Sequence, residues 1–391
     1  MTDVLRTDRP GRDELGRVLT ESGVLSPDWA PTFAAVDRAE FLPDLMWPYD
    51  MASRATVTVD RRDDPGAWYA AADSDVPIVT QWDDGAHPGP GPGKLSTSSS
   101  SMPSTVYALL QDLAVEDGMR VLDVGTGTGE TAGALAHRLG EENVTTIDVD
   151  AAVSGAARER LRRRGPHPEM VVGDGFDGHP GSAPYDRIVA SVGVRRIPDA
   201  WIGQTRAGAI ILAPFGTPYG NADAMVRLER RGETAAGRFT RRVEFMKLRA
   251  QRGPEVVADD YLSRGPVKDA DMSRTSLTEG QFLPGQWSDL PFVLGLRVPA
   301  CRQAVADKRE GARPVWFHSL SDLSWACVMF QDGEAEARVW QSGPRRLWDE
   351  VSDAYRWWRD RGCPDVTRFG LTVTPRGHRA WLDDPEESWP L

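Results

Sequence analysis

A glycine-rich turn follows a short apolar segment near the middle of the chain. The segment reads Val121-Leu122-Asp123-Val124 and continues as Gly-Thr-Gly-Thr-Gly over 125–129. Glycines directly after a buried strand let the backbone approach a ligand at the carboxyl edge of a parallel sheet. The turn therefore predicts a small-molecule site, although a glycine pattern of this kind also fits dinucleotide-binding folds.

Three aspartates narrow the choice of ligand. Asp123 precedes the glycines, Asp148 ends the next apolar segment and Asp174 ends the one after that. A carboxylate after the second strand can accept both hydroxyls of a ribose, and one after the third can meet an adenine amino group. S-adenosylmethionine has no phosphates but carries a positive amino group and a sulfonium, so acids suit it better than a phosphate-cradling helix terminus does. The pattern favours S-adenosylmethionine, with S-adenosylhomocysteine as product, over a nicotinamide cofactor.

The alternative interpretation is that the glycines only make a tight turn and the aspartates only cap helices. We instead expect all of these positions to contact the cofactor. The expected cofactor-binding residues are Asp123, Gly125, Thr126, Gly127, Thr128, Gly129, Asp148, Val149, Asp174 and Gly175.

Apolar and helical segments alternate regularly between residues 104 and 225. This spacing predicts βαβ units in an α/β, Rossmann-like doubly wound parallel sheet that positions the aspartates at one edge. The expected strands are 119–124, 143–150, 169–174, 185–192 and 207–216, and the expected helices are 104–115, 131–140 and 151–165.

The flanking segments differ from this core. We expect 1–103 to be an N-terminal helical and loop segment that contributes to the substrate site, with helix over 12–41, a break at 26–28 and an exposed loop over 85–94. We expect 104–225 to be the cofactor-binding core and 226–391 to be an additional α+β domain. In this extension we expect a hairpin around Gly232, loops over 250–290 and a helix over 345–362 that ends at Gly362.

Composition restricts the class of protein. The chain has 391 residues and a formal net charge of −12, which argues against a nucleic-acid binder. The cysteines Cys301, Cys327 and Cys363 form no CxxC pair, so we expect no metal site and a reducing environment. The charged N-terminus lacks the apolar region of a secretory signal, and no apolar run is long enough to span a membrane. We expect a soluble cytoplasmic protein of unknown oligomeric state.

The motifs resemble those of the protein-L-isoaspartate O-methyltransferase family over about residues 29–220. VLDVGTGTGETAGALAHRLG resembles the family's glycine-rich motif, and the upstream stretch 33–43 is similar to its helix ending in R-x-x-F-V-P. Further matches are GDGFDG (173–178), PYDRIVAS (184–191) and GAIILAPFG (208–216). Ser101-Met102-Pro103 matches a Ser-x-Pro that, in this family, lies beside the transferred methyl group.

The resemblance implies a carboxyl O-methyltransferase in which Ser101, helped by Ser99 and Ser100, donates hydrogen bonds to the acceptor carboxylate. The carboxylate is already ionised at neutral pH, so proximity and orientation supply most of the catalysis and no general base is needed. For the serine run over 96–98, a flexible linker is an equally good interpretation.

Some features depart from the family's repair enzymes. Glu130 stands where those enzymes usually carry an aromatic residue, the loop before Ser101 is longer, and the chain continues far beyond the sheet. These traits resemble the relatives that modify ribosomally made peptides in lanthipeptide, lasso-peptide and graspetide pathways. The hypothesis is methylation of an aspartate in such a peptide, followed by closure to an aspartimide or hydrolysis to isoaspartate.

Two other hypotheses remain open: isoaspartate repair, and a cofactor-binding scaffold that has lost catalysis. The expected partner is a peptide, with 331–346 as its candidate surface. Most tryptophans of the extension are expected to pack in the core, with Trp348, Tyr355 and Trp358 on one helix face.

Overall fold

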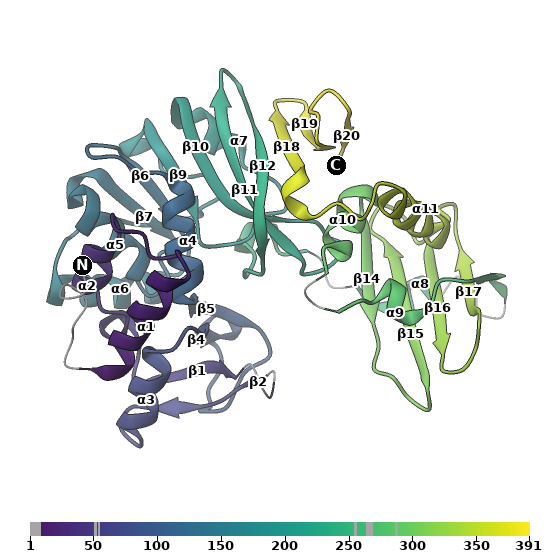
Figure 1. Ribbon diagram of the computed structural model, residues 1–391, viewed down its shortest axis with the longest axis horizontal. Coiled ribbons are helices and arrows are strands. Elements are labelled where there is room, and N and C mark those ends of the chain that lie inside the picture. The colour runs from purple at the N-terminus through teal and green to yellow at the C-terminus, as the bar shows by residue number, and fades with distance from the viewer. Residues whose placement is uncertain (1–8, 51–52, 54, 254–255, 263–268, 286–287) are drawn as a thin grey trace.

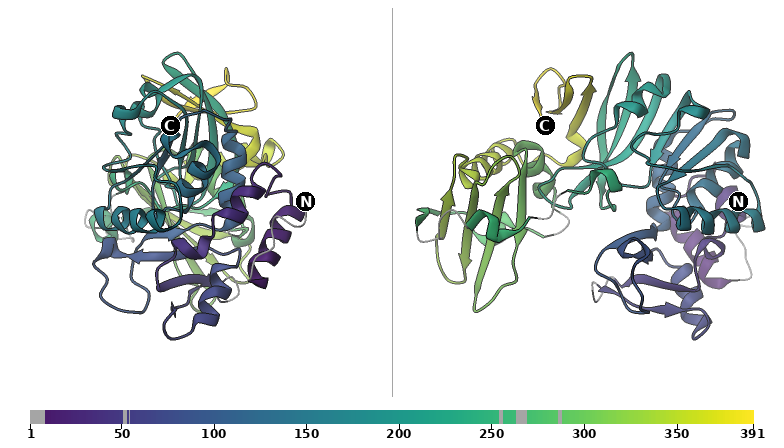
Figure 2. Two further views of the ribbon diagram at one scale, coloured as in Figure 1. Left: turned by 90° about the vertical axis from the view of Figure 1, so that its left-hand side faces the viewer. Right: turned by 180° about the vertical axis from the view of Figure 1, so that it is seen from behind.

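The computed structural model describes residues 9–391 except 51–52, 54, 254–255, 263–268 and 286–287. In the described part, three β-sheets form an arch, with a long central sheet at the top and two smaller lobes below it (Figure 1). Figure 2 shows from behind that both lobes lie on the same side of the central sheet.

The central sheet has ten strands in the order β20-β19-β18-β12-β11-β10-β9-β6-β7-β8. Neighbours are parallel from β8 to β10 and antiparallel from β10 to β20. The parallel strands are β6 (Val121–Val124), β7 (Val144–Asp148), β8 (Glu169–Val172), β9 (Tyr185–Ala190) and β10 (Thr205–Gly216). The antiparallel strands are β11 (Asp223–Arg231), β12 (Thr234–Val243), β18 (Phe369–Thr374), β19 (Gly377–Leu382) and β20 (Ser388–Pro390).

The strand order reverses beside β6, because β7 and β8 continue to one side while β9 and β10 lie on the other. In open α/β sheets such a reversal leaves a crevice outside the carboxyl ends of the strands, where ligands bind. The predicted doubly wound parallel sheet is therefore confirmed for strands β6 to β10, and its reversal places a ligand site after β6 and β9.

Helices bury both faces of the central sheet. One face packs against α1 (Pro10–Glu21), α2 (Ala30–Ala35), α4 (Pro103–Leu113) and α5 (Glu130–Leu139), around Leu110, Leu135 and Val189. The other face packs against α7 (Asp199–Gly203) and α10 (Leu290–Arg297), around Trp201 and Phe292. The helix α6 (Ala151–Arg164) follows β7 and lies beside β7 and β8.

The N-terminal lobe contains a sheet that the sequence did not predict. Its strands pair in the order β2-β1-β4-β5, and β3 also pairs with β1. They are β1 (Leu45–Asp50), β2 (Ala55–Thr56), β3 (Val59–Asp60), β4 (Ile78–Trp82) and β5 (Ser96–Ser100), with α3 (Pro65–Ala72) packed among them and the short turns η2 (Arg38–Phe41) and η3 (Asp83–Gly85). Short strands, the proline in β1 and the all-polar β5 gave no alternating apolar signal, so the expectation of helix and loop alone was wrong.

The C-terminal lobe has a five-stranded sheet in the order β13-β17-β16-β15-β14, covered by α11 (Leu347–Asp360) and α9 (Glu279–Phe282). The strands are β13 (Asp271–Thr275), β14 (Cys301–Val305), β15 (Ala312–Ser319), β16 (Trp325–Gln331) and β17 (Ala337–Ser342), and α8 (Ala258–Leu262) precedes them. The helix expected over 345–362 is confirmed as α11. The loops expected over 250–290 contain short helices and a strand in their described part, while 254–255, 263–268 and 286–287 lie outside the described residues.

The expected domain boundary at 225/226 does not match the sheet. Strand β11 crosses it, the hairpin around Gly232 joins β11 to β12, and the last three strands return to pair with β12. The C-terminal lobe is therefore an insertion between β12 and β18. The periodic pattern of the core ended at β10 because antiparallel strands carry no intervening helices, and that absence looked like a domain end.

Candidate active site

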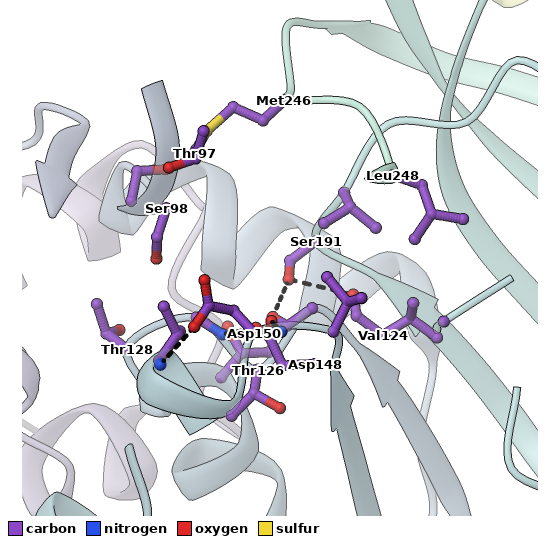
Figure 3. A pocket seen from close by; sticks show the side chains of 18 of the residues that line it. Thr97, Ser98, Val124, Thr126, Thr128, Asp148, Asp150, Ser191, Met246 and Leu248 are labelled. Carbon is purple, nitrogen blue, oxygen red and sulfur yellow. Dashed lines mark hydrogen bonds between the residues drawn. The ribbon is translucent and has the colours of Figure 1, made fainter. Parts of the chain in front are cut away.

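An open cavity of about 880 Å³ lies at the carboxyl ends of β6, β7 and β9. Figure 3 shows it between the glycine turn below, the serine strand β5 above, and the segment that carries Met246 and Leu248. The lining residues are Thr97–Ser101, Val106, Val124–Thr128, Glu130, Thr131, Ile147–Asp150, Val153, Gly175, Ser191, Val192, Met246–Arg249 and Arg252.

The glycine turn is shaped by left-handed backbone conformations. Gly125, Gly127 and Gly129 have φ values of 99°, 53° and 94°, which L side chains rarely adopt. A Cβ on Gly125 would also lie 2.8 Å from Val192 Cγ1. Only glycine allows the turn to pass under the cavity with its backbone exposed to a ligand.

Asp148 holds this turn in place. Its Oδ2 accepts a hydrogen bond from the Gly127 N–H at 2.9 Å, and its Oδ1 accepts one from the Asp150 N–H, also at 2.9 Å. Burial raises the pKa of the Asp148 carboxyl, and the two backbone N–H groups oppose this shift. A carboxylate offers about four lone-pair sites, so two remain for the vicinal hydroxyls of a ribose.

Three of the expected cofactor contacts, Asp123, Asp174 and Gly129, do not lie on the cavity wall. Asp123 is fully buried below the turn, where Thr146 donates to its Oδ2 at 2.8 Å and in turn meets Thr126 at 2.7 Å. Asp174 accepts from the Phe176 N–H at 2.9 Å and so caps its own loop. Neither side chain is on the cavity wall, so a direct contact of either carboxylate with the cofactor stays a prediction. The other expected cofactor residues, Gly125–Gly127, Thr128, Asp148, Val149 and Gly175, line the cavity, while Gly129 begins α5 just beyond it.

The serine run forms strand β5, which rules out the linker interpretation. Burial alternates along it: Ser98 and Ser100 are 8% and 2% exposed, while Ser99 and Ser101 are more open to the cavity. In the described part of the chain, the side chains of Ser99 and Ser101 make no hydrogen bond, so their hydroxyls are available to a ligand.

Ser100 has a different environment from its neighbours. Its hydroxyl accepts from Arg38 Nε at 2.9 Å and donates to Glu130 Oε2 at 3.0 Å. The expectation that Ser100 donates to the acceptor is therefore not met, because its one proton is used by Glu130. Successive side chains of an extended strand point to opposite faces, so Ser100 lies on the face opposite to Ser99 and Ser101.

Arg38 is a residue whose importance the sequence did not reveal. Its guanidinium is buried and donates to the carbonyl oxygens of Ser100 and Ser101 at 3.2 and 3.0 Å. It also donates to Ser74 and Val76 in the N-terminal lobe. Glu130 lies 3.9 Å from Arg38 Nε, and the cost of burying its charge raises the pKa of the Glu130 carboxyl. Arg38 belongs to the stretch 33–43 that resembles the family. This resemblance was the only feature of the sequence that could have pointed to Arg38.

The third wall comes from residues 246–252, after β12. Its backbone pairs with Gly193 through bonds of 2.7 Å to Met246 O and 2.9 Å from Leu248 N. Lys247 Nζ lies 2.5 Å from Oδ2 of Asp223, which is fully buried. This segment contributes five lining residues. No local sequence pattern pointed to the cavity here.

Metal binding has no support in the described part of the chain, which contains no cluster of three or more His, Cys, Asp or Glu able to hold an ion. Cys301 and Cys327 are buried in the C-terminal lobe and Cys363 is exposed, and none of them lines the cavity. Across the residues that the structure describes, no helix is both long and apolar enough to cross a lipid bilayer.

Comparison with known proteins bears on the family to which the chain belongs. A family model described as protein-L-isoaspartate(D-aspartate) O-methyltransferase matches residues 89–253. Protein-L-isoaspartate O-methyltransferase 2 of Polaromonas sp. (strain JS666) is 35% identical over 149 residues, covering 38% of this chain and 70% of the relative. The protein-L-isoaspartate O-methyltransferase of Azorhizobium caulinodans is 37% identical over 119 residues, covering 30% of this chain and 54% of the relative. The chain thus spans about half of the length of some curated relatives.

A solved structure titled protein-L-isoaspartate O-methyltransferase aligns with 95% of this chain and 100% of its own, at 19% identity and a TM-score of 0.53. At this identity the likeness is one of fold. Because it covers nearly the whole chain, the likeness extends beyond the central sheet, so the presence of an extension does not by itself separate this chain from proteins of that title.

The doubly wound sheet, the glycine turn and the carboxylate after the second strand define a class I S-adenosylmethionine-dependent methyltransferase. The cofactor is accordingly S-adenosyl-L-methionine, with S-adenosyl-L-homocysteine as its product. Within this class, the chain belongs to the protein-L-isoaspartate O-methyltransferase family.

Proposed function

We propose that this protein methylates the side-chain carboxylate of an aspartate in a ribosomally made, modified peptide. The observation that carries the proposal is the pairing of Asp148 and the glycine turn with the open hydroxyls of Ser99 and Ser101 across one cavity. Asp148 and the glycine turn suit the cofactor. The hydroxyls of Ser99 and Ser101 suit an anionic acceptor, which needs hydrogen-bond donors.

The chemistry requires little of the protein beyond placement. Bound S-adenosylmethionine supplies an electrophilic methyl group. The acceptor oxygen forms a bond to the methyl carbon as the carbon–sulfur bond breaks, and no proton moves. Ser99 and Ser101 orient the carboxylate, and Arg38 fixes the strand by holding its carbonyl groups. Orientation of this kind supplies a large part of the rate enhancement in such transfers.

The methyl ester then activates the carbonyl. Attack by the backbone nitrogen of the following residue releases methanol, with the amide proton leaving on the methoxide, and closes a five-membered aspartimide. Hydrolysis of this ring gives aspartate or isoaspartate. This step needs no residue of the protein.

Glu130 favours tailoring over repair. It occupies a position on the cavity wall where repair enzymes usually have an aromatic residue, and Arg38 and Ser100 hold it. The Glu130 side of the cavity is polar and ion-paired. It therefore suits a different acceptor backbone from the one that packs against the aromatic ring of a repair enzyme. The curated relatives bear the name of the isoaspartate enzymes, so repair is the second candidate function.

Two peptides of identical sequence, one with aspartate and one with isoaspartate, separate the two functions. Each is incubated with the protein and S-adenosylmethionine, and mass spectrometry records the gain of one methyl group and the later loss of methanol. Tailoring predicts methylation of the aspartate form within the correct ring-containing peptide, and repair predicts methylation of the isoaspartate form in many linear peptides. Methylation of neither form in any candidate peptide, by a protein that binds S-adenosylhomocysteine, favours the scaffold hypothesis.

A further inference from the structure

Segment 246–252 closes one side of the cavity and is tied firmly to the central sheet. In addition to its backbone pairing with Gly193, the side chain of Gln251 accepts from the N–H groups of Arg195 and Arg196 at 2.6 and 2.8 Å. Gln251 also donates to Arg196 O at 2.7 Å. The segment is therefore fixed to the loop after β9 on this side.

Its opposite side reaches across to the N-terminal lobe through two arginines that both line the cavity. Arg252 meets both oxygens of Asp84, at 2.7 and 3.0 Å, and Arg249 Nε lies 3.0 Å from the same carboxylate. Arg249 also meets Asp150 Oδ2 at 2.8 Å, and Gln81 of β4 donates to that oxygen at 3.1 Å. Three chain segments, 81–84, the loop at Asp150 and 249–252, therefore converge at one edge of the cavity.

Asp84 is held in an unusual backbone conformation. Asp83 and Asp84 have φ values of 51° and 54°, in the left-handed region that non-glycine residues rarely adopt. The Asp83 carboxylate accepts from the Lys94 and Leu95 N–H groups at 3.1 and 2.8 Å and so closes the base of the Gly-Pro loop. Strained residues that surrounding contacts enforce are concentrated at functional sites. In this loop the strain fixes the direction in which Asp84 presents its carboxylate.

Asp150 connects this cluster to the cofactor side of the cavity. Its N–H donates to Asp148 Oδ1 at 2.9 Å, and its own carboxylate caps α6 through Ala152 and Val153. A shift of Arg249 therefore acts on the loop that holds Asp148. We propose that Asp84, Arg249, Arg252 and Asp150 form an ionic clasp, in which Asp84 is a positioning residue that keeps segment 246–252 over the bound cofactor.

The inference deepens the proposed function at its cofactor site and is independent of the acceptor. Asp84 is 41% exposed and the two arginines are each 28% exposed, so solvent and salt screen the pairs and the effect is moderate. We expect Asp84→Asn to release S-adenosylhomocysteine about three to ten times faster, with Kd raised by a similar factor. Salt should reduce the difference, because it weakens the wild-type clasp.

The test measures release of S-adenosylhomocysteine by stopped-flow fluorescence in the full-length protein, with calorimetry for Kd. Asparagine tolerates the left-handed conformation, so Asp84→Asn is expected to fold, and its Tm is compared with that of the wild type. The matched control is Glu21→Gln, which removes an exposed ion pair with Arg17 on α1 and should leave release unchanged.

A double-mutant cycle separates the clasp from a direct role of the arginine. If the clasp acts as proposed, Asp84→Asn adds little in an Arg252→Gln background. Unchanged release in Asp84→Asn, or the same acceleration in Glu21→Gln, overturns the clasp. Strictly additive effects of the two changes also overturn it, since Arg252 then acts on the cofactor alone. Two further outcomes separate the clasp from the proposed function. If Asp84→Asn accelerates release but the wild type methylates no peptide, only the acceptor assignment is wrong. If the wild type does not bind S-adenosylhomocysteine, the cofactor site itself is wrong.

Discussion

The two sides of the cavity are built in different ways. The cofactor side consists of the glycine turn and Asp148, whose contacts join residues on neighbouring parallel strands, such as Gly127 and Asp148. The acceptor side consists of β5, and segment 246–252 covers the cofactor. Both are held by contacts between residues far apart in the chain, such as Arg38 with Ser100 and Arg252 with Asp84. The first side depends on a compact motif, and the second depends on the whole arch being assembled.

This difference implies that changes near the cofactor motif should act locally, while changes at distant strands should reach the acceptor side. The wall at 246–252 directly follows β12, and β12 is held in the sheet by β11 and β18. The residues after 225 therefore support the cavity as well as forming the C-terminal lobe.

The largest expected effect comes from a chain that ends at residue 225. It cuts β11 and removes buried core residues such as Phe239, Phe369 and Leu371 from the central sheet. Each large apolar side chain contributes about 1.5–3 kcal/mol on burial, against a total stability of about 5–15 kcal/mol. We expect no cooperative unfolding transition by circular dichroism and no binding of S-adenosylhomocysteine.

A chain that ends at residue 384 is the control. It loses β20 and the contacts of Trp389 at the edge of the core but keeps the other nine strands of the central sheet, and it should still bind the cofactor product. A folded, cofactor-binding chain of 225 residues would contradict a structural role for the strands after β10. It would also restore the domain boundary that the sequence suggested.

The sequence could predict the parallel half of the sheet because each βαβ unit repeats an apolar strand, a glycine and an amphipathic helix. It also singled out Asp148 and, through resemblance to a family, Ser99 and Ser101, which the structure places on the cavity wall. It could not predict β1 to β5, because these strands are short and none shows an alternating apolar pattern. It also could not predict the return of β18 to β12, because pairing between strands more than a hundred residues apart leaves no local pattern. Arg38, Lys247, Arg249 and Arg252 were missed for the same reason: their partners lie on other segments.

The next largest effect concerns the pH dependence of stability on the cofactor side. Burial raises the pKa of Asp123 to about 7, with a smaller contribution from Asp148, while Thr146 opposes the shift. In the unfolded chain the pKa is about 4, so folding favours the protonated carboxyl. The protonated carboxyl of Asp123 therefore contributes up to about 4 kcal/mol to the free energy of unfolding below pH 4. This contribution is lost as the pH rises to about 7.

Asp123→Asn tests this, because the amide keeps an acceptor for Thr146 and does not titrate. Relative to the variant, the wild type should lose free energy of unfolding between pH 4 and 7, measured by urea denaturation at each pH. Parallel curves for the two proteins across this range would show that the Asp123 carboxyl has an ordinary pKa.

A smaller effect is expected for Asp148→Ala, which removes the proposed ribose contact and the bond to Gly127. The loss of a charge-assisted pair of hydrogen bonds should weaken binding of S-adenosylhomocysteine by about 2–3 kcal/mol, or about 30- to 150-fold. Titration calorimetry measures this, with Asp174→Ala as the matched control, since Asp174 caps its own loop and is expected to change affinity little. Equal losses in the two variants would return Asp174 to the cofactor site and argue against the special position of Asp148.

The smallest effect separates two adjacent serines of the acceptor side. Ser101→Ala removes a hydroxyl that faces the cavity without a partner in the described part of the chain, whereas Ser100→Ala removes one held between Arg38 and Glu130. Ser101→Ala should therefore slow methyl transfer about tenfold, the value of one hydrogen bond of about 1.4 kcal/mol, with the Kd for cofactor and the Tm unchanged. Ser100→Ala should instead lower the Tm, because the buried ion pair loses its bridging hydroxyl. Single-turnover kinetics with the peptide substrate and thermal unfolding measure the two outcomes.

If both variants lose rate equally and keep their Tm, the alternation of roles along β5 is wrong. If Ser101→Ala raises the Kd of the cofactor while turnover stays normal, its hydroxyl belongs to the cofactor side of the cavity.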